Sequence, residues 1–177
     1  MTESDIRLVL QATLQALVGL QLSIARDAAS MKIFHFGDIR PHISGKGTVG
    51  AYALHIQCPW RIVSDDGVVT GASDRFVSPC EDVEVDDEDG RLGNLQLVRI
   101  AALLKGYDTS TKSHVNSTDE LVVTSVTSDK YGGAELLLSG GYRLQIFPDS
   151  SHEEDWRFID VKGRHVVIEK ARASIME

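Results

Sequence analysis

Residues 51–63 alternate between apolar and polar side chains, and no other feature of this sequence constrains the fold as strongly. A period of two is that of a β-strand with one buried face and one exposed face. Pro59 has no N–H to donate, so we expect this strand to lie at a sheet edge or to bulge there. An Asp-Asp-Gly turn at 65–67 and an apolar stretch at 68–72 then predict an antiparallel hairpin.

The polar face of this predicted strand carries His55, Gln57 and Arg61. All three side chains can donate hydrogen bonds, so they are predicted to line a binding groove in which Arg61 recognises a carboxylate or phosphate. The alternative is a face that is only solvated. Cys58 falls on the apolar face and is predicted to be an inert core thiol, since a strand points it away from His55.

Two helices are predicted, at residues 4–18 and about 95–105, from apolar residues at helical spacing. Asn94 is expected to cap the second helix and Gly106 to end it. The buried stripe of the second helix is predicted to comprise Leu97, Ile100, Ala101 and Leu104.

The other segments predict a mainly antiparallel α+β fold in which two helices pack on the sheets. Residues 107–118 are polar and predict a loop. The chain is interpreted as one domain, residues 1–177, in which an acidic linker at 81–91 joins an N-terminal helix-plus-hairpin half to a C-terminal helix-plus-meander half. The further strands are predicted at residues 20–24, 31–36, 121–127, 134–139, 142–147, 156–161 and 165–169, the last two ending the chain's regular structure.

The net charge of −8 is concentrated in one segment. Without its seven acids, 19 acidic residues face 18 basic ones, which leaves a net charge of −1. The segment does not match an EF-hand, because the sixth and twelfth positions counted from Asp82 are Asp87 and Gly93. It is either a solvated linker or a docking surface for a basic protein. Its acids are Glu81, Asp82, Glu84, Asp86, Asp87, Glu88 and Asp89.

Several functional classes are not expected from this composition. Nucleic-acid binding is not expected because the basic residues do not cluster. No apolar run reaches the roughly 18 residues of a membrane span, and no basic leader is visible, so we expect a cytoplasmic protein without a membrane partner. The histidines and the two cysteines show no metal-ligand spacing, so no metal and no cofactor are expected, and Cys58 and Cys80 are expected to be reduced.

Residues 141–158 combine a glycine turn, the letters Leu-Gln-Ile-Phe-Pro-Asp and then Glu-Asp-Trp-Arg-Phe. This stretch resembles a pattern of small uncharacterised bacterial α+β proteins, G-x-x-L-x-V-F-P-D followed by E-x-W-R-F, although Ile146 stands where the pattern has Val. Some of those proteins are similar to immunity partners of polymorphic toxins. The resemblance covers residues 121–160 and implies a non-enzymatic bacterial protein.

Two functional hypotheses follow. The first is an interaction protein, such as an immunity-type inhibitor, that engages a basic partner through its acidic segment. The second is a small-ligand binder or an enzyme that uses the polar face of residues 51–63. A structural homodimer formed through an exposed sheet edge is a third interpretation.

Overall fold

The computed structural model describes residues 3–80 and 93–176, and its regular structure is mainly antiparallel β-sheet, accompanied by two α-helices. This arrangement is compatible with the predicted α+β class. The helical elements are α1 (Glu3–Leu14), η1 (Gln15–Leu17), η2 (Ala72–Phe76) and α2 (Leu95–Leu104). The strands are β1 (Leu22–Ala28), β2 (Met31–Phe36), β3 (Arg40–Pro41), β4 (Thr48–Val49), β5 (Tyr52–Ile56), β6 (Trp60–Ser64), β7 (Gly67–Gly71), β8 (Lys105–Asp108), β9 (Ser113–Asn116), β10 (Val123–Ser128), β11 (Ala134–Leu138), β12 (Tyr142–Ile146), β13 (Glu154–Asp160), β14 (His165–Glu169) and β15 (Arg172–Met176).

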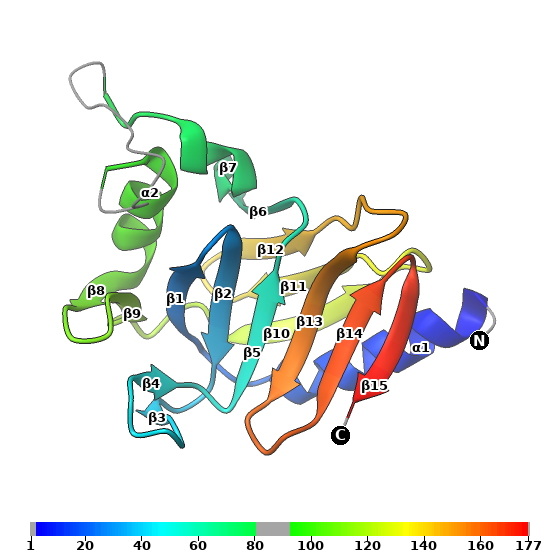
Figure 1. The fold of residues 1–177 in the computed structure, drawn as a ribbon. Coiled ribbons are helices and arrows are strands. Elements are labelled where there is room, and N and C mark those ends of the chain that lie inside the picture. The colour runs from blue at the N-terminus through cyan, green and yellow to red at the C-terminus, as the bar shows by residue number, and fades with distance from the viewer. Residues whose placement is uncertain (1–2, 81–92, 177) are drawn as a thin grey trace.

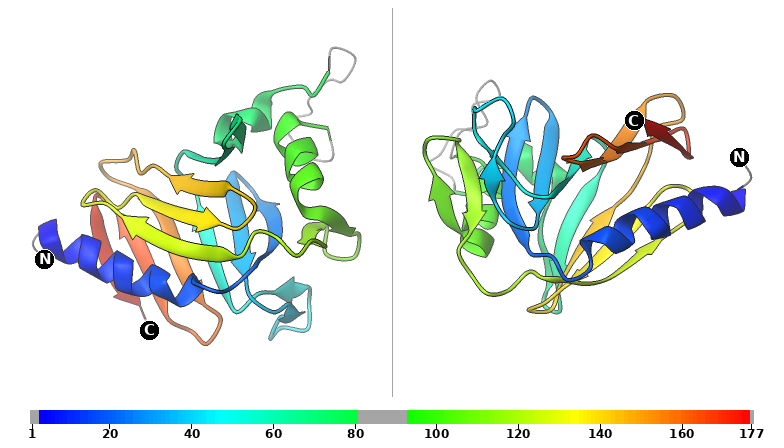
Figure 2. Two further views of the ribbon diagram at one scale, coloured as in Figure 1. Left: turned by 180° about the vertical axis from the view of Figure 1, so that it is seen from behind. Right: turned by 90° about the horizontal axis from the view of Figure 1, so that it is seen from below.

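Two sheets form the body of the protein (Figure 1). The large sheet has eight strands in the order β15-β14-β13-β5-β2-β1-β9-β8, and the small sheet has five in the order β10-β11-β12-β6-β7. Figure 2 shows them as two layers, with α1 lying against β10 of the small sheet and reaching β15 of the large one. At the other end, α2 packs on β7, β8, β9 and η2. The short hairpin of β3 and β4 stands apart as a third sheet.

The predicted strand at residues 51–63 is two strands in two different sheets. β5 pairs with β2 and β13 in the large sheet, whereas β6 pairs with β12 and β7 in the small one. The chain changes sheets at Cys58 and Pro59, where the N–H groups of Gln57 and Cys58 both donate to the carbonyl of Asp155. Pro59 therefore marks a corner between the sheets rather than an edge strand or a bulge, since its missing N–H interrupts pairing in either sheet.

Four smaller predictions about the second half of the chain were wrong. Residues 107–118 are not a loop throughout, because β8 and β9 form a hairpin there. In α2 the buried stripe includes Leu103 instead of Ala101, and the left-handed residue that ends the helix is Lys105 (φ 64°) rather than Gly106. A further strand, β15, follows β14. The Asn94 cap was confirmed, because its side chain accepts a hydrogen bond from the Leu97 N–H at 2.9 Å.

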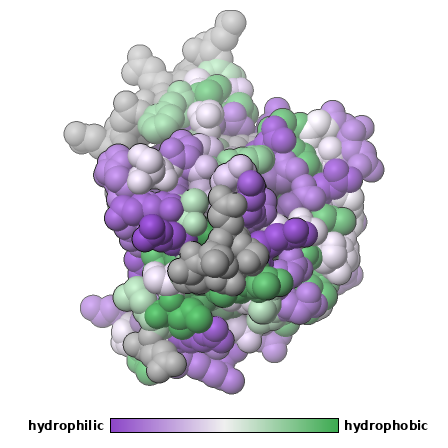
Figure 3. Space-filling model, turned by 90° about the vertical axis from the view of Figure 1, so that its right-hand side faces the viewer, coloured by the Kyte–Doolittle hydropathy of each residue, from purple (hydrophilic) through white to green (hydrophobic). Residues whose placement is uncertain are grey.

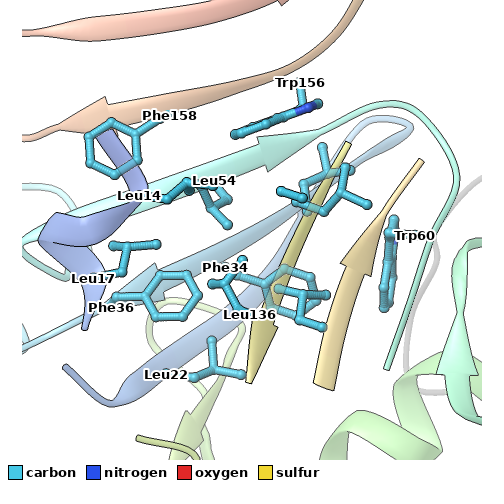
Figure 4. Close-up of a cluster of buried hydrophobic side chains, with 14 of the residues drawn as sticks. Leu14, Leu17, Leu22, Phe34, Phe36, Leu54, Trp60, Leu136, Trp156 and Phe158 are labelled. Carbon is cyan, nitrogen blue, oxygen red and sulfur yellow. The ribbon is translucent and has the colours of Figure 1, made fainter. Parts of the chain in front are cut away.

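The core lies between the two sheets and is closed on one side by α1 (Figure 4). Phe34 of the large sheet meets Trp60 of the small sheet edge to face, with ring centroids 5.1 Å apart. Each sheet contains strands from both sides of the acidic segment in sequence, since β13 pairs with β5 and β12 pairs with β6. Neither helix in the described parts of the chain has the length and apolarity that crossing a membrane requires.

The strand β15 forms one end of the large sheet. Its residues Ile175 and Met176 are each about half exposed. Figure 3 views the molecule from the right-hand side of Figure 1 and shows hydrophobic residues gathered in the lower half of that face. A homodimer formed through a sheet edge stays a prediction.

Candidate functional site

The corner at Pro59 separates the three residues that the sequence placed on one polar face. His55 lies on β5, on the face of the large sheet that points away from the core. Arg61 lies on β6 in the small sheet, where its Nε donates to Oε1 of Gln145 at 2.7 Å and its guanidinium stacks on Phe147. The structure therefore does not bring Arg61 to the same site as His55.

Gln57 lies one step along the same face from His55, beside an ion pair. Its Nε2 donates to Glu154 at 3.3 Å, and Arg157 donates to both carboxylate oxygens of Glu154, at 2.7 and 2.5 Å. The hydrogen bond from Arg157 is the main reason that the pKa of Glu154 is lowered. Arg157 is also the cross-strand neighbour of His55.

A cavity of about 670 Å³ opens on this outer face of the large sheet. Its floor is formed by side chains that alternate with the core residues of β2, β5, β13 and β14. Two loops form its rim: the hairpin 40–49, which contains β3 and β4, and the turn 161–164 between β13 and β14. The volume lies within the range of small-molecule sites.

Aliphatic side chains supply much of the cavity wall. Ile33 and Ala53 come from the floor strands, Ile159 from β13, and Val49 from the hairpin 40–49. Ile33 and Ala53 are almost completely buried although they point away from the core, because the hairpin covers this part of the sheet. The wall is therefore suited to an apolar group.

The charged residues at the cavity are mostly cations. Arg26, Arg40 and Lys162 line it, against a single carboxylate, Asp160, whose Oδ1 already accepts from the Lys162 N–H. The seven acids of residues 81–89 lie outside the described residues. A concave apolar surface ringed by cations favours a negatively charged ligand, because the low-polarity wall strengthens its attraction to them.

Four histidines line the same cavity: His35, His42, His55 and His165. Burial lowers the pKa of His35 to about 3, with Arg26 as the next cause, and burial followed by Arg157 lowers the pKa of His55 to about 4. Both rings are therefore neutral at pH 7. Within the described residues, no group of three or more histidine, cysteine or carboxylate side chains is arranged to hold a metal ion.

Arg26 ties the floor of the cavity to its rim. Its Nη2 lies 2.5 Å from Nε2 of His35 on β2 and donates at 2.9 Å to the carbonyl of Thr48 on β4. Because a guanidinium has no acceptor, Nε2 of the neutral His35 accepts this hydrogen bond. Arg26 is thus held in a fixed orientation at the cavity, which reduces the entropy lost when it binds a ligand.

Sequence reasoning found His55 but missed the other polar residues of this cavity. The one available signal was in residues 31–36, where Ile33 and His35 alternate with Phe34 and Phe36. That pattern indicates a strand on which other parts of the protein pack against both faces. His35 then marks a buried polar position on the face opposite Phe34 and Phe36. The rim residues come from short loops that carry no periodic signal.

A second buried polar group lies on the core side of the large sheet. The Lys32 side chain is 2 % exposed, and its Nζ contacts Asp27 at 3.0 Å and lies 6.0 Å from the centre of the Trp60 ring. Burial lowers the pKa of Lys32, whereas Asp27 opposes this shift. The cavity beside it measures only about 30 Å³, which is the space of one water molecule.

Cys58 is buried beside Asp155, and burial raises the pKa of its thiol to about 12. The nucleophilic thiolate is therefore scarce at neutral pH. We expect a disulfide reagent such as Ellman's reagent to modify one thiol in the native protein, the exposed Cys80, and two after unfolding in guanidinium. The Cys80→Ser variant should show no native reaction, and rapid native labelling of that variant would contradict the burial of Cys58.

Comparison of this chain with protein-family models, with curated proteins and with solved structures found no match. The geometry of the cavity is therefore the basis on which a function is proposed. A basic protein partner for the acidic segment stays a separate prediction.

Proposed function

We propose that this protein binds a small amphipathic anion in the cavity between the large sheet and the hairpin 40–49. The observation that carries the proposal is the grouping of three cations and one carboxylate around an aliphatic wall, in a chain whose net charge is −8. Cations supply charge-assisted hydrogen bonds to the anionic head, and the aliphatic wall takes up the apolar body.

The neutral ring of His55 supports this assignment. A neutral imidazole offers one N–H donor and adds no charge, so His55 is able to contribute a hydrogen bond to the ligand while Arg26, Arg40 and Lys162 provide the attraction. The guanidinium of Arg157 lies next to His55 but is occupied by Glu154. The free hydrogen-bonding capacity of the cavity therefore lies at its rim, at His55 and at Arg26.

A fluorescence titration with dansyl-undecanoate, a carboxylate with an apolar body, tests the proposal. We expect saturable binding of one molecule per chain, and weaker binding of the uncharged dansyl-undecanol. Arg40→Gln and Lys162→Gln should each weaken binding of the carboxylate about tenfold, since a hydrogen bond to a charged group contributes about 1.5–3 kcal/mol, reduced here by solvent exposure.

Arg143→Gln is the matched control, because Arg143 is an exposed arginine on β12 of the small sheet. It should bind the probe as the wild type does. Equal affinity for the carboxylate and the alcohol, or equal affinity in all three variants, would show that the cavity does not select an anion.

A further inference from the structure

The rim of the cavity carries exposed aliphatic side chains. Ile43, in the hairpin 40–49, is 100 % exposed, and Val161, in the turn 161–164, is 37 % exposed. Both also line the cavity mouth. Figure 1 shows that these two loops lie at the same end of the large sheet, which is the lower end in that view.

The same two loops concentrate positive charge. The hairpin 40–49 contains Arg40 and Lys46 and no acid, and the turn 161–164 contains Lys162 and Arg164 and no acid. All four side chains are exposed. Within the described part of the chain, none of the four forms a salt bridge. The nearest acids in sequence are Asp38 and Asp160, which flank the two loops.

We infer that the rim of the cavity docks on an anionic lipid surface, and that the cavity takes its ligand from that surface. Loop tips that combine an aliphatic residue with cations match the interface of such a membrane, where the aliphatic side chain enters the acyl boundary and the cations meet lipid phosphates. The charges are complementary although the whole chain is acidic, because attraction to the surface acts within about one Debye length and depends on the nearest groups.

This inference rests on the proposed function, since it names where an amphipathic anion enters the cavity. It differs from the expectation of no membrane partner, which is based on the lack of a spanning segment and which no observation here contradicts. Surface docking needs no spanning segment, only a few apolar side chains and a basic patch. Residues of both loops line the cavity, so a lipid headgroup that enters it from the docked surface would pass between them and the sheet.

Co-sedimentation of the full chain with vesicles tests the inference. We expect binding to vesicles of phosphatidylcholine mixed with phosphatidylglycerol, and much weaker binding to phosphatidylcholine alone. Binding should fall as salt is raised. Lys46→Glu should weaken binding about tenfold through loss and reversal of one charge, and Ile43→Ser should weaken it by a similar factor through loss of the inserted side chain.

Two matched variants serve as controls. Arg143→Glu makes the same kind of charge reversal on the small sheet, and Leu8→Ser removes an exposed leucine of α1, 67 % exposed. Both should bind vesicles as the wild type does. Absence of binding to the anionic vesicles would overturn the inference, and so would equal losses in the rim and control variants. Normal dansyl-undecanoate binding in the same preparations would show that the proposed function stands without it.

Discussion

Replacing Trp156 by alanine is expected to lower the free energy of unfolding by about 3–5 kcal/mol, because the change leaves a large cavity in the core. Trp156 is completely buried and lies opposite Ile56 and Ile168 in the large sheet. Its indole N–H donates at 2.9 Å to the carbonyl of Gly132, in the turn between β10 and β11 of the small sheet. The side chain therefore connects the two sheets by packing and by a hydrogen bond.

Guanidinium unfolding curves measure this loss of stability. A second variant separates the contribution of packing from that of the hydrogen bond. Trp156→Phe keeps most of the buried area but leaves the Gly132 carbonyl without its donor, so a loss of about 1–3 kcal/mol is expected. The control is Phe76→Ala, because Phe76 is 71 % exposed, and its loss should stay within about 0.5 kcal/mol. A similar, small loss in Trp156→Ala and Phe76→Ala would contradict the two-sheet core.

Lowering the pH from 6.5 to 5 should destabilise the protein by about 2 kcal/mol through His35 alone. The unfolded chain protonates this histidine near its usual pKa of 6.5, whereas burial beside Arg26 lowers the pKa in the folded state to about 3. Between these two values the unfolded state binds more protons than the folded state. The contribution of His35 is therefore complete above pH 6.5 and is lost as the pH falls, by about 1.4 kcal/mol per pH unit.

The difference between wild type and His35→Gln isolates this effect from that of the carboxylates. The variant has no proton to gain at this position, and its amide oxygen is able to accept from Arg26, so its stability should fall less steeply between pH 6.5 and 5. His152→Gln is the control, because the His152 side chain is 76 % exposed. His55 has a pKa of about 4 in the folded state, so it also lowers the stability as the pH falls. It does so equally in all three proteins and leaves the difference between them unchanged. Parallel curves for wild type and His35→Gln would refute the burial of a neutral His35.

The stretch that resembles bacterial α+β proteins has structural roles within the described residues. Trp156 and Phe158 are core residues, and Arg157 pairs with Glu154 at the surface of the large sheet. The buried carboxylate of Asp155 accepts hydrogen bonds from the N–H groups of Asp149 and Ser150, which fixes the loop that leads into β13. The letters Phe-Pro-Asp and Trp-Arg-Phe thus describe a loop and the strand β13 that follows it.

Local patterns predicted those parts of the fold in which one residue fixes the conformation of its neighbours. Asn94 has a short side chain that satisfies a free N–H, so the start of α2 was predictable. The turns before β7 and between β11 and β12 were predictable because glycine supplies the positive φ that a tight hairpin requires. Lys105, by contrast, adopts a positive φ that its residue type does not favour, and the sequence predicted glycine next to it instead.

The site was predicted only at His55, and the reason lies in pairing between distant segments. Residues 51–63 look like one continuous strand because their burial pattern is uninterrupted, from Leu54 to Ile62. The choice between one sheet and two depends on which strands pair with them, and those are β13 and β12, about 100 and 80 residues away.

The alternation of apolar residues therefore determined by itself that this chain forms antiparallel sheet with two amphipathic helices, because burial of one face is a local requirement of each segment. Tertiary structure alone decided that the chain turns between two sheets at Pro59, that Arg61 leaves the site, and that Arg26, His35 and Lys162 meet His55 around one cavity. A polar residue on an outward face satisfies the same local pattern whether it meets water or another segment, so only the arrangement of the distant strands and loops makes it part of a site.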